Sequence, residues 1–428
     1  MEVSRLPGSL DGEQIQKERN AVMEYDPENR KGTGLGFVLA VYAASRLLYL
    51  VSGSIFARVV PTSGFQRVTQ DVPSGSMNIW SHWDGEHYVM LATSGYLNPP
   101  DNVSPAFFPL YPLLVRSFAQ LFGGPISKEA ISVWAPVISL LFLPFALYFV
   151  YHIALDGWGE RAARGTVLIL AFFPTTFFLN AAYTESLFLA LSAGSLWALR
   201  VRRNLLLACV LAGFASATRN VGLFLFVPLL YEWIHDGGLD RGRERWRGLY
   251  LALVPSGLFA YMGYLWLRFG NPFLFYSAQQ HWGRRATGPI ATVSGAWGSA
   301  VEGAGRLLDP GLWANPTLGG LANHLARAGN FSNLLFFVFA VVVLLAGSRD
   351  LPPSLTLYGL LLVAPAALFG TPESPLMGTP RYVLVAFPIC IVLGLLSSNR
   401  RLFGGLLFLG TLLSLLLCAL FVSWRFVA

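Results

Sequence analysis

The sequence predicts an all-α membrane protein with several spanning helices. Of its 428 residues, 54% are hydrophobic and only 12% are charged, about half of the charged fraction that a soluble domain usually carries. Continuous apolar runs, several long enough to cross a bilayer, recur along the whole chain. They occupy residues 37–57, 131–155, 249–267, 331–346, 355–369, 382–396 and 402–422. An outer-membrane barrel would show short alternating segments instead.

Basic clusters order these elements into about 11 crossings if every cluster faces the cytoplasm. The first crossing is expected near 35–58, and the chain returns near 129–155. Hairpins follow near 161–200 and 204–235, then a crossing at 247–268. Three more crossings end at 397, and the last leaves the C-terminus outside. The clusters used are Arg30-Lys31, Arg161/Arg164, Arg200/Arg202/Arg203, Arg241 to Arg247, Arg349 and Arg400-Arg401.

The domain organisation follows from this path. Residues 1–31 are polar and charged, which predicts a cytoplasmic tail rather than a signal peptide. Residues 32–428 form one transmembrane domain, with a first external region at 59–127 and a long external loop at 269–330. Residues 107–122 are short and contain two prolines, so we expect them to be interfacial or re-entrant.

The net charge does not indicate a nucleic-acid partner, and the cysteines do not indicate disulfides or a metal site. The formal charge of +7 comes from arginine clusters between apolar runs, which are typical of orientation signals and not of nucleic-acid binding. Cys209, Cys390 and Cys418 stand alone within apolar segments. We therefore interpret them as core residues rather than as disulfides or metal ligands.

Five polar turns fall on the external side of the predicted path. They are the region around Asp84, residues 182–186, 218–220 and 279–282, and the tripeptide 380–382. A random distribution would divide such turns between the two faces. Their agreement predicts one shared external cavity, and ionisable groups at a membrane boundary indicate a functional site.

Asp84 is the strongest catalytic candidate within this set. Residues 80–96 have the three- and four-residue spacing of a short amphipathic helix, which would place Asp84, His87 and Tyr88 on one face. Glu86 lies beside them. A carboxylate partly desolvated among aromatic rings should have a raised pKa and can act as a general base. The alternative is a helix cap.

Glu185 and Arg219 are expected to interact inside the cavity. Glu185 can orient a substrate or pair with an arginine, or it can belong to the first turn of the next helix. Arg219 lies between two apolar segments, where an isolated cation is costly, so a partner is expected. A lipid phosphate or Glu185 would serve, and a purely structural ion pair is the alternative.

The later turns carry groups suited to a sugar or a phosphate. Residues 279–285 supply two amides, a tryptophan and two guanidiniums, which match sugar hydroxyls and phosphate oxygens. An interfacial anchor is the equal alternative. Arg381 and Tyr382 open an apolar segment and can face either the cavity or a lipid headgroup. The substrate-binding candidates are thus Glu86, His87, Tyr88, Tyr111, Glu185, Arg219, Asn220, Gln279, Gln280, Trp282, Arg284, Arg285, Arg381 and Tyr382.

Several motifs of soluble enzyme chemistry are absent from the sequence. It contains no P-loop, dinucleotide glycine fingerprint, His-Glu-x-x-His or Gly-x-Ser-x-Gly. It also lacks the Asp-x-Asp pair of metal-bridged, nucleotide-sugar transferases. An activated donor that already resides in the membrane fits this pattern better.

The sequence resembles the GPI mannosyltransferase II family and its prokaryotic homologues. The resemblance rests on Trp-Asp-Gly-Glu-His-Tyr at 83–88, the Phe-Phe-Pro-Leu-Tyr-Pro run at 107–112, Tyr-Thr-Glu-Ser-Leu-Phe at 183–188 and Ala-Thr-Arg-Asn-Val-Gly at 217–222. Gly-Asn-Pro-Phe at 270–273, Gln-Gln-His-Trp-Gly at 279–283 and Pro-Arg-Tyr at 380–382 are similar to later motifs of the prokaryotic branch. The resemblance covers roughly residues 35–400 and is most specific in its first third.

This resemblance implies a GT-C glycosyltransferase with its active site on the non-cytoplasmic face. It implies an inverting transfer of mannose from polyprenyl-phosphate mannose to a glycolipid or lipid-linked glycan, with Asp84 as the catalytic base. Arg219, Arg381 or the Arg284/Arg285 pair would hold the phosphate. No cofactor is required, although Asp84 with Glu86 could hold a divalent metal. The membrane would be the plasma membrane of a prokaryote or the endoplasmic reticulum of a eukaryote.

Two other functions are alternatives to this expectation. A transporter or flippase of lipid-linked sugars should show repeated hydropathy in the two halves, but the region 59–127 has no counterpart later in the chain. An intramembrane hydrolase would need a nucleophile near His87, and only Ser81 is close. The glycosyltransferase remains the first hypothesis.

Overall fold

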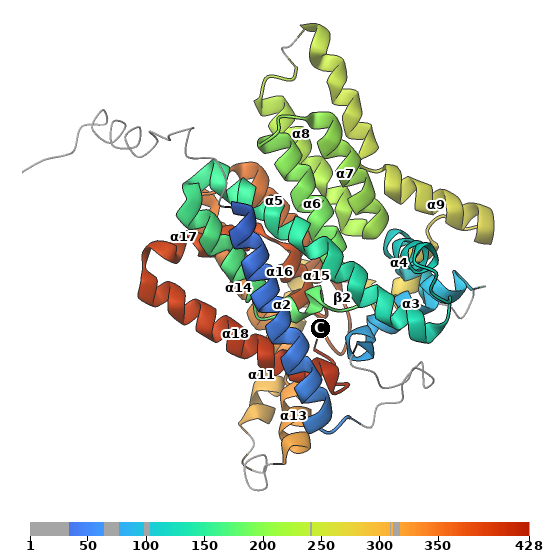
Figure 1. Ribbon diagram of the computed structural model, residues 1–428, viewed down its shortest axis with the longest axis vertical. Coiled ribbons are helices and arrows are strands. Elements are labelled where there is room, and N and C mark those ends of the chain that lie inside the picture. Colours follow the sequence, from blue (N-terminus) through green and yellow to red (C-terminus); the bar gives the residue numbers. More distant parts are fainter. Residues whose placement is uncertain are drawn as a thin grey trace, which may run out of the picture.

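The protein is almost entirely helical in its computed structural model (Figure 1). The structure describes residues 34–63, 77–97, 103–239, 242–308, 310 and 317–427. The predicted tail at 1–31 and parts of both predicted external loops lie outside these residues. The all-α class is confirmed: among the described residues, the only strands are β1 (Arg285–Ala286) and β2 (Phe369–Gly370), which pair antiparallel with Arg285 opposite Gly370.

The helices outside the first external region include those that contain the apolar runs of the sequence, together with α11 and α13 from the segment expected as a loop. They are α2 (Gly34–Val59), α5 (Lys128–Ala171), α6 (Glu185–Arg200), α7 (Leu205–Thr218), α8 (Phe226–His235), α9 (Ser256–Phe269), α11 (Pro289–Leu307), α13 (Leu318–Arg327), α14 (Gly329–Ala346), α15 (Pro353–Leu368), α16 (Thr379–Val385), α17 (Pro388–Leu395) and α18 (Arg400–Val422). Between them lie α10 (Leu274–Ser277) and the 3-10 turns η4 (Thr176–Leu179), η5 (Asn220–Leu225), η6 (Gly242–Leu253) and η7 (Ala278–Trp282).

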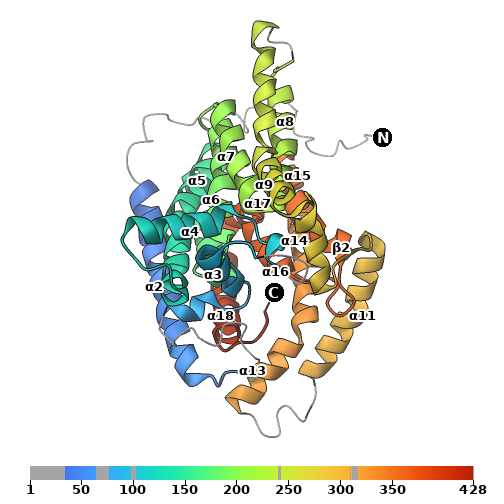
Figure 2. The ribbon, with the colours of Figure 1, turned by 90° about the vertical axis from the view of Figure 1, so that its right-hand side faces the viewer.

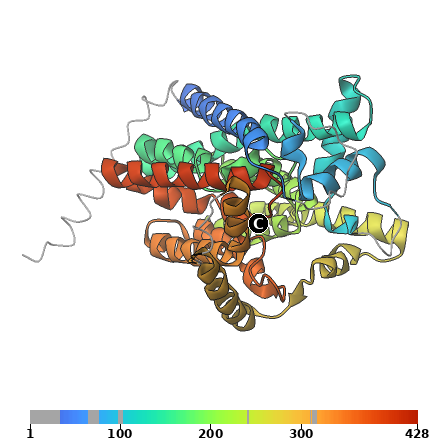
Figure 3. The same cartoon turned by 90° about the horizontal axis from the view of Figure 1, so that it is seen from below.

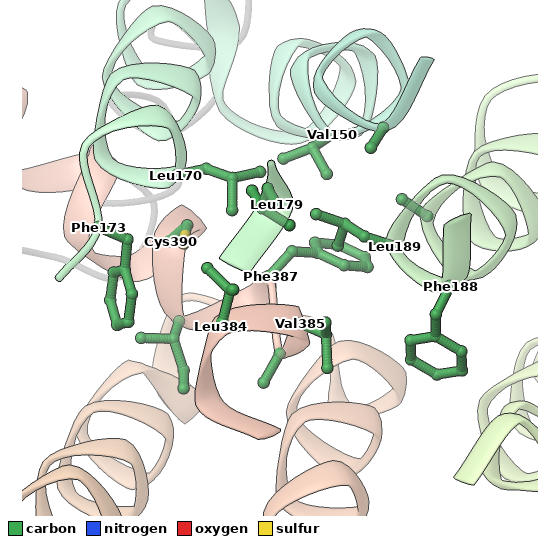
Figure 4. Packing of buried hydrophobic residues seen from close by; sticks show 14 of the residues in the cluster. Val150, Leu170, Phe173, Leu179, Phe188, Leu189, Leu384, Val385, Phe387 and Cys390 are labelled. Carbon is green, nitrogen blue, oxygen red and sulfur yellow. The ribbon is translucent and has the colours of Figure 1, made fainter. Parts of the chain in front are cut away.

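Helix α5 is the centre of the bundle and packs against α2, α6 and α17. Its backbone breaks at Gly159, where φ is 78°, so the long helix is two helices joined at a bend. Figure 4 shows Leu170, Phe188 and Phe387 within the core that α5 shares with α6 and α17. Because lipid is as apolar as these side chains, close packing rather than burial alone holds the helices together.

The membrane character of the chain is clear from the helices themselves. Four of the described helices, α2, α5, α14 and α18, are long and apolar enough to span a bilayer, and two bent helix pairs raise that number to six. Their outward side chains are large and apolar, as at Leu47 and Phe408. Helices α18 and α2 lie side by side (Figure 3). The chain is an integral membrane protein.

The expected count of about 11 crossings is not confirmed. Helices α7 and α15, which the sequence suggested as crossings, have 14 and 16 residues, whereas a crossing normally needs about 20. The segment expected as a loop at 269–330 is largely helical where it is described, because α11 alone contributes 19 residues. Helices α7 and α8 lie toward one end of the molecule, and α11 and α13 toward the other (Figure 2).

The first external region forms a small helical layer on α5. It consists of η2 (Asn78–Ser81), α3 (Asp84–Ser94), η3 (Ser104–Ala106) and α4 (Leu110–Leu121). The sequence predicted one helix over 80–96, but the helix begins only at Asp84, because Trp83 adopts a positive φ of 60°. Trp80 therefore lies in the preceding turn, where it is fully buried.

All three cysteines are buried and free, as the sequence predicted.

Candidate active site

Four charged residues meet where helices begin or end. Asp84 and Glu185 are the first residues of α3 and α6, where the helix dipole favours a negative charge. Arg219 lies in an extended link between α7 and η5, and Arg381 lies in the first turn of α16. Four segments spread over nearly 300 residues thus converge on one point.

Arg381 joins the two carboxylates. Its Nη1 donates to Asp84 Oδ2 at 2.5 Å, and its Nε donates to Glu185 Oε1 at 2.7 Å. Arg219 Nη1 donates to the same Glu185 oxygen at 2.8 Å. The ion pair that the sequence suggested between Arg219 and Glu185 is therefore present.

The two carboxylates differ in their access to solvent. The Glu185 side chain is completely buried, whereas 30% of the Asp84 side chain is exposed. Neither acid makes a side-chain cap hydrogen bond, although Glu185 does stand in the first turn of α6, as one of its two alternatives from the sequence had it. Glu185 is thus suited to fix the arginines, and Asp84 is free on one side to meet a substrate.

A pocket of about 140 Å³ opens in front of Asp84. Three guanidiniums, those of Arg219, Arg284 and Arg381, line it together with aromatic rings. Arg284 is held by the carbonyl oxygen of Met377 and the hydroxyl of Tyr382, at 3.0 and 3.3 Å. Such a set of forked cations matches the oxygens of a phosphate group.

The pKa of Asp84 differs from the sequence prediction. Burial acts to raise it, but the charge and the hydrogen bond of Arg381 outweigh burial, with smaller contributions from His87 and Arg219, so the pKa lies below its ordinary value. The prediction of a raised pKa was wrong because it did not include Arg381, which is 297 residues away. Asp84 is therefore ionised at neutral pH.

His87 lies one turn after Asp84 and is held between aromatic rings. Its imidazole stacks on Phe107 at 4.6 Å and meets Trp282 edge-on at 6.3 Å. Burial lowers its pKa, although the Asp84 charge opposes that effect, so the ring is neutral at pH 7. Its buried Nδ1 has no hydrogen-bond partner within the described part of the chain and is available to a ligand.

Most of the predicted site residues are brought together. The pocket is lined by Asp84, Tyr88, Arg219, Asn220, Gln279, Trp282, Arg284, Arg381 and Tyr382, with Glu185 and His87 directly behind.

Four predicted residues lie elsewhere. Tyr111 is buried in the core, where its hydroxyl donates to the Ala135 carbonyl at 2.7 Å. Arg285 is exposed in β1, and neither Glu86 nor Gln280 lines the pocket. Alternate residues of a turn point in different directions, so adjacency in sequence did not translate into a shared site.

The structure also adds a segment that the sequence did not indicate. Phe426 lines the pocket and meets Trp83 edge-on at 5.3 Å, while Trp424 stacks on His82 at 3.9 Å. Trp83 and Trp424 both have positive φ, near 60°, a strained conformation that tends to occur at functional sites. The segment Ser423–Val427 thus packs against the start of α3. Its aromatic residues are the feature of the sequence that could have indicated a place in the site.

Within the described residues, no group of three or more His, Cys, Asp or Glu side chains is arranged to hold a metal ion.

A known protein family matches the part of the chain that contains three of the four charged residues. Residues 36–233 match the family model described as Mannosyltransferase (PIG-V). Over these residues, the PIG-V segment, the chain is similar to that mannosyltransferase family. Asp84, Glu185 and Arg219 all fall within the PIG-V segment, whereas Arg381 and Phe426 fall outside it.

Curated relatives match the chain over comparable lengths. The chain is 27% identical over 215 residues to GPI mannosyltransferase 2 of Drosophila pseudoobscura pseudoobscura, covering 47% of each chain. It is 26% identical over 208 residues to human GPI alpha-1,6-mannosyltransferase 2, covering 44% of this chain and 40% of that one. The matched segment therefore spans less than half the length of these relatives.

Solved structures resemble the chain over a longer range. ArnT from Cupriavidus metallidurans bound to undecaprenyl phosphate is 16% identical, with a TM-score of 0.49, covering 87% of this chain and 62% of that one. The archaeal oligosaccharyltransferase AglB from Archaeoglobus fulgidus, in complex with an inhibitory peptide and a dolichol-phosphate, is 12% identical, with a TM-score of 0.36, covering 88% of this chain and 55% of that one.

Proposed function

We propose that the protein is a membrane glycosyltransferase that moves mannose from polyprenyl-phosphate mannose to a hydroxyl of a glycolipid or lipid-linked glycan. One observation carries this proposal: a partly exposed carboxylate, Asp84, faces a pocket that three guanidiniums line. The carboxylate suits proton abstraction, and the guanidiniums suit a phosphate leaving group. The PIG-V segment supports mannose as the sugar.

The proposed reaction is a single inverting displacement. The acceptor hydroxyl gives its proton to Asp84, and its oxygen forms a bond to the anomeric carbon. The bond from that carbon to the phosphate oxygen breaks at the same time, and polyprenyl phosphate leaves with the bonding electrons. Arg219, Arg284 and Arg381 would stabilise the charge that grows on the phosphate.

Arg381 couples the two halves of this reaction. In the structure it neutralises Asp84 and lowers the pKa of that carboxylate. A donor phosphate in the pocket would compete for the same Nη1 group and weaken the contact with Asp84. Asp84 would then become a stronger base at the moment when the donor is in place.

The active site would face the non-cytoplasmic side of the membrane. The basic clusters at 161–164, 200–203 and 400–401 lie at helix ends, and such clusters favour the cytoplasm. Arg200 ends α6, whereas Glu185, at the site, begins it, so the site and this basic cluster lie at opposite ends of one helix.

The test is sugar transfer by the purified protein in detergent. Labelled polyprenyl-phosphate mannose is offered with a panel of glycolipid acceptors, and a nucleotide-activated mannose serves as the donor control. We expect transfer only from the lipid donor. Asp84→Asn should lower the rate by about 10²–10⁴-fold, the usual contribution of a general base.

Asp350→Asn is the matched control, because Asp350 is exposed and lies in the turn after α14. It should leave the rate unchanged. Transfer from the nucleotide donor, or near-normal turnover by Asp84→Asn, would contradict the proposal.

A further inference from the structure

A second and larger pocket lies far from Asp84, at the opposite ends of the same helices. It has a volume of about 670 Å³ and forms where α6 ends, α7 begins and α8 ends; these helices stand together in Figure 1. Arg381 joins Asp84 to Glu185, the first residue of α6, whereas this pocket includes Leu199 near the last residue of α6. Sixteen helical residues extend about 24 Å, which approaches the thickness of a bilayer core.

The rim of this pocket is a tight turn that carries two neighbouring arginines. The turn between α6 and α7 is closed by hydrogen bonds from the Arg202 and Asn204 amides to the carbonyls of Trp197 and Ala198, at 3.2 and 2.9 Å. Arg203 adopts a positive φ of 52°, and Asn204 caps α7. The backbone is thus fixed, with Arg202 and Arg203 exposed side by side at the opening.

The opposite wall is a tryptophan held in place by two glycines. A Cβ added at Gly238 or Gly248 would come within 2.4 or 2.8 Å of the Trp233 ring, so both backbones touch the indole. This contact anchors η6, which contributes Arg247 and Tyr250 to the same pocket. The cavity is therefore defined by packed backbone and not only by flexible side chains.

The lining carries more basic than acidic side chains among the residues that the structure describes. Three are arginines, Arg202, Arg203 and Arg247, and one is an acid, Asp236, whose Oδ2 lies 3.6 Å from Arg203 Nη1. Arg202 lies over the Trp197 ring at 5.8 Å. A cation–π contact does not use up the guanidinium N–H groups, so they can still donate hydrogen bonds.

We propose that this pocket binds the phosphate headgroup of an anionic phospholipid. Forked guanidiniums match phosphate oxygens, and basic pockets between membrane helices favour such headgroups. Leu205 and Leu206, which also line the pocket, provide an apolar surface beside the cations. A free phosphate could bind the same cations, but it has no apolar part that would contact this surface.

Native mass spectrometry of the delipidated protein in detergent tests the proposal. The probes are phosphatidylglycerol, phosphatidylcholine and inorganic phosphate, each titrated separately, and sugar transfer is not needed as a readout. We expect phosphatidylglycerol to bind at concentrations at least tenfold lower than phosphatidylcholine. The double variant Arg202→Gln/Arg247→Gln should lose that preference, and Arg202→Lys/Arg247→Lys should keep only part of it.

Arg400→Gln/Arg401→Gln is the matched control, since both arginines are exposed and neither lines the pocket. It should retain the full preference. An equal loss in this control, or full binding by the lysine pair, would overturn the proposal by reducing it to a general charge effect. Phosphate binding that matches phosphatidylglycerol would overturn the lipid source in favour of a free anion.

Discussion

Replacing Glu185 with glutamine should destabilise the protein far more than replacing Asp84 with asparagine. Glu185 is completely buried and its Oε1 accepts from two guanidiniums, at 2.8 and 2.7 Å. Removing one member of a buried pair leaves uncompensated charge and costs about 3–5 kcal/mol. Arg381 still retains its contact with Asp84 in this variant. We therefore expect the free energy of unfolding to fall by about 3 kcal/mol, the lower end of that range.

The loss at Asp84 should be smaller for structural reasons. Its side chain is 30% exposed, so solvent screens the pair, and Arg381 keeps Glu185 when Asp84 becomes asparagine. A partly exposed ion pair is worth about 1 kcal/mol or less. Asp84→Asn should thus remain folded while it loses sugar transfer.

Thermal unfolding in detergent, followed by size-exclusion chromatography of the heated samples, measures this order. Glu302→Gln is the control, because Glu302 also pairs with an arginine, Arg306, but 67% of its side chain is exposed. Its melting temperature should equal that of the wild type. If Asp84→Asn melts as low as Glu185→Gln, the division into a structural acid and a substrate-facing acid is wrong.

Three further predictions concern pH and the pocket wall. Arg381→Gln removes the main influence that lowers the pKa of Asp84, so the acid limb of kcat/KM should move to higher pH; an unmoved limb between pH 4 and 8 would exclude Asp84 as the base. The folded state holds His87 with a lowered pKa, so the unfolded chain binds its proton more readily and stability should fall as pH drops below about 6.5. His87→Gln should remove that component, which melting temperatures at pH 5.5 and 7.5 will measure. Phe426→Ala should raise KM by about tenfold through lost contact in the pocket, roughly 1.4 kcal/mol, whereas Phe408→Ala, 72% exposed on α18, should not change it.

Sequence reasoning located the polar turns but not the contacts between them. Asp84 stood out because a carboxylate at a membrane boundary is costly, and Arg219 needed a partner for the same reason. Periodicity could not reveal that Arg381 reaches both Asp84 and Glu185, since the contact depends on how α16 packs against the start of α6. The same holds for Phe426, whose position depends on the path of the chain after α18.

The helix count was less predictable for a physical reason. Hydropathy identifies apolar segments, but it does not fix where a helix bends. Gly159 divides α5 through its positive φ, and the pairs α16/α17 and η6/α9 bend by 69° and 42°. Short and broken helices are tolerated in a membrane where neighbouring protein satisfies their backbone groups. The number of membrane crossings in this chain therefore cannot be obtained by counting its apolar runs.

The charge of the site explains why an acid with a lowered pKa can still serve as the proposed base. Asp84 and Glu185 together with Arg219, Arg284 and Arg381 carry a formal charge of +1, which matches the single negative charge of a sugar phosphodiester. In the proposed transfer the proton would pass to Asp84 while the phosphate would gain a second negative charge. The site would then carry +2 opposite a dianion, so neutrality would be preserved at every stage. Arg381 would move from Asp84 to the phosphate in the same step, and the carboxylate would accept the proton as its stabilising partner leaves.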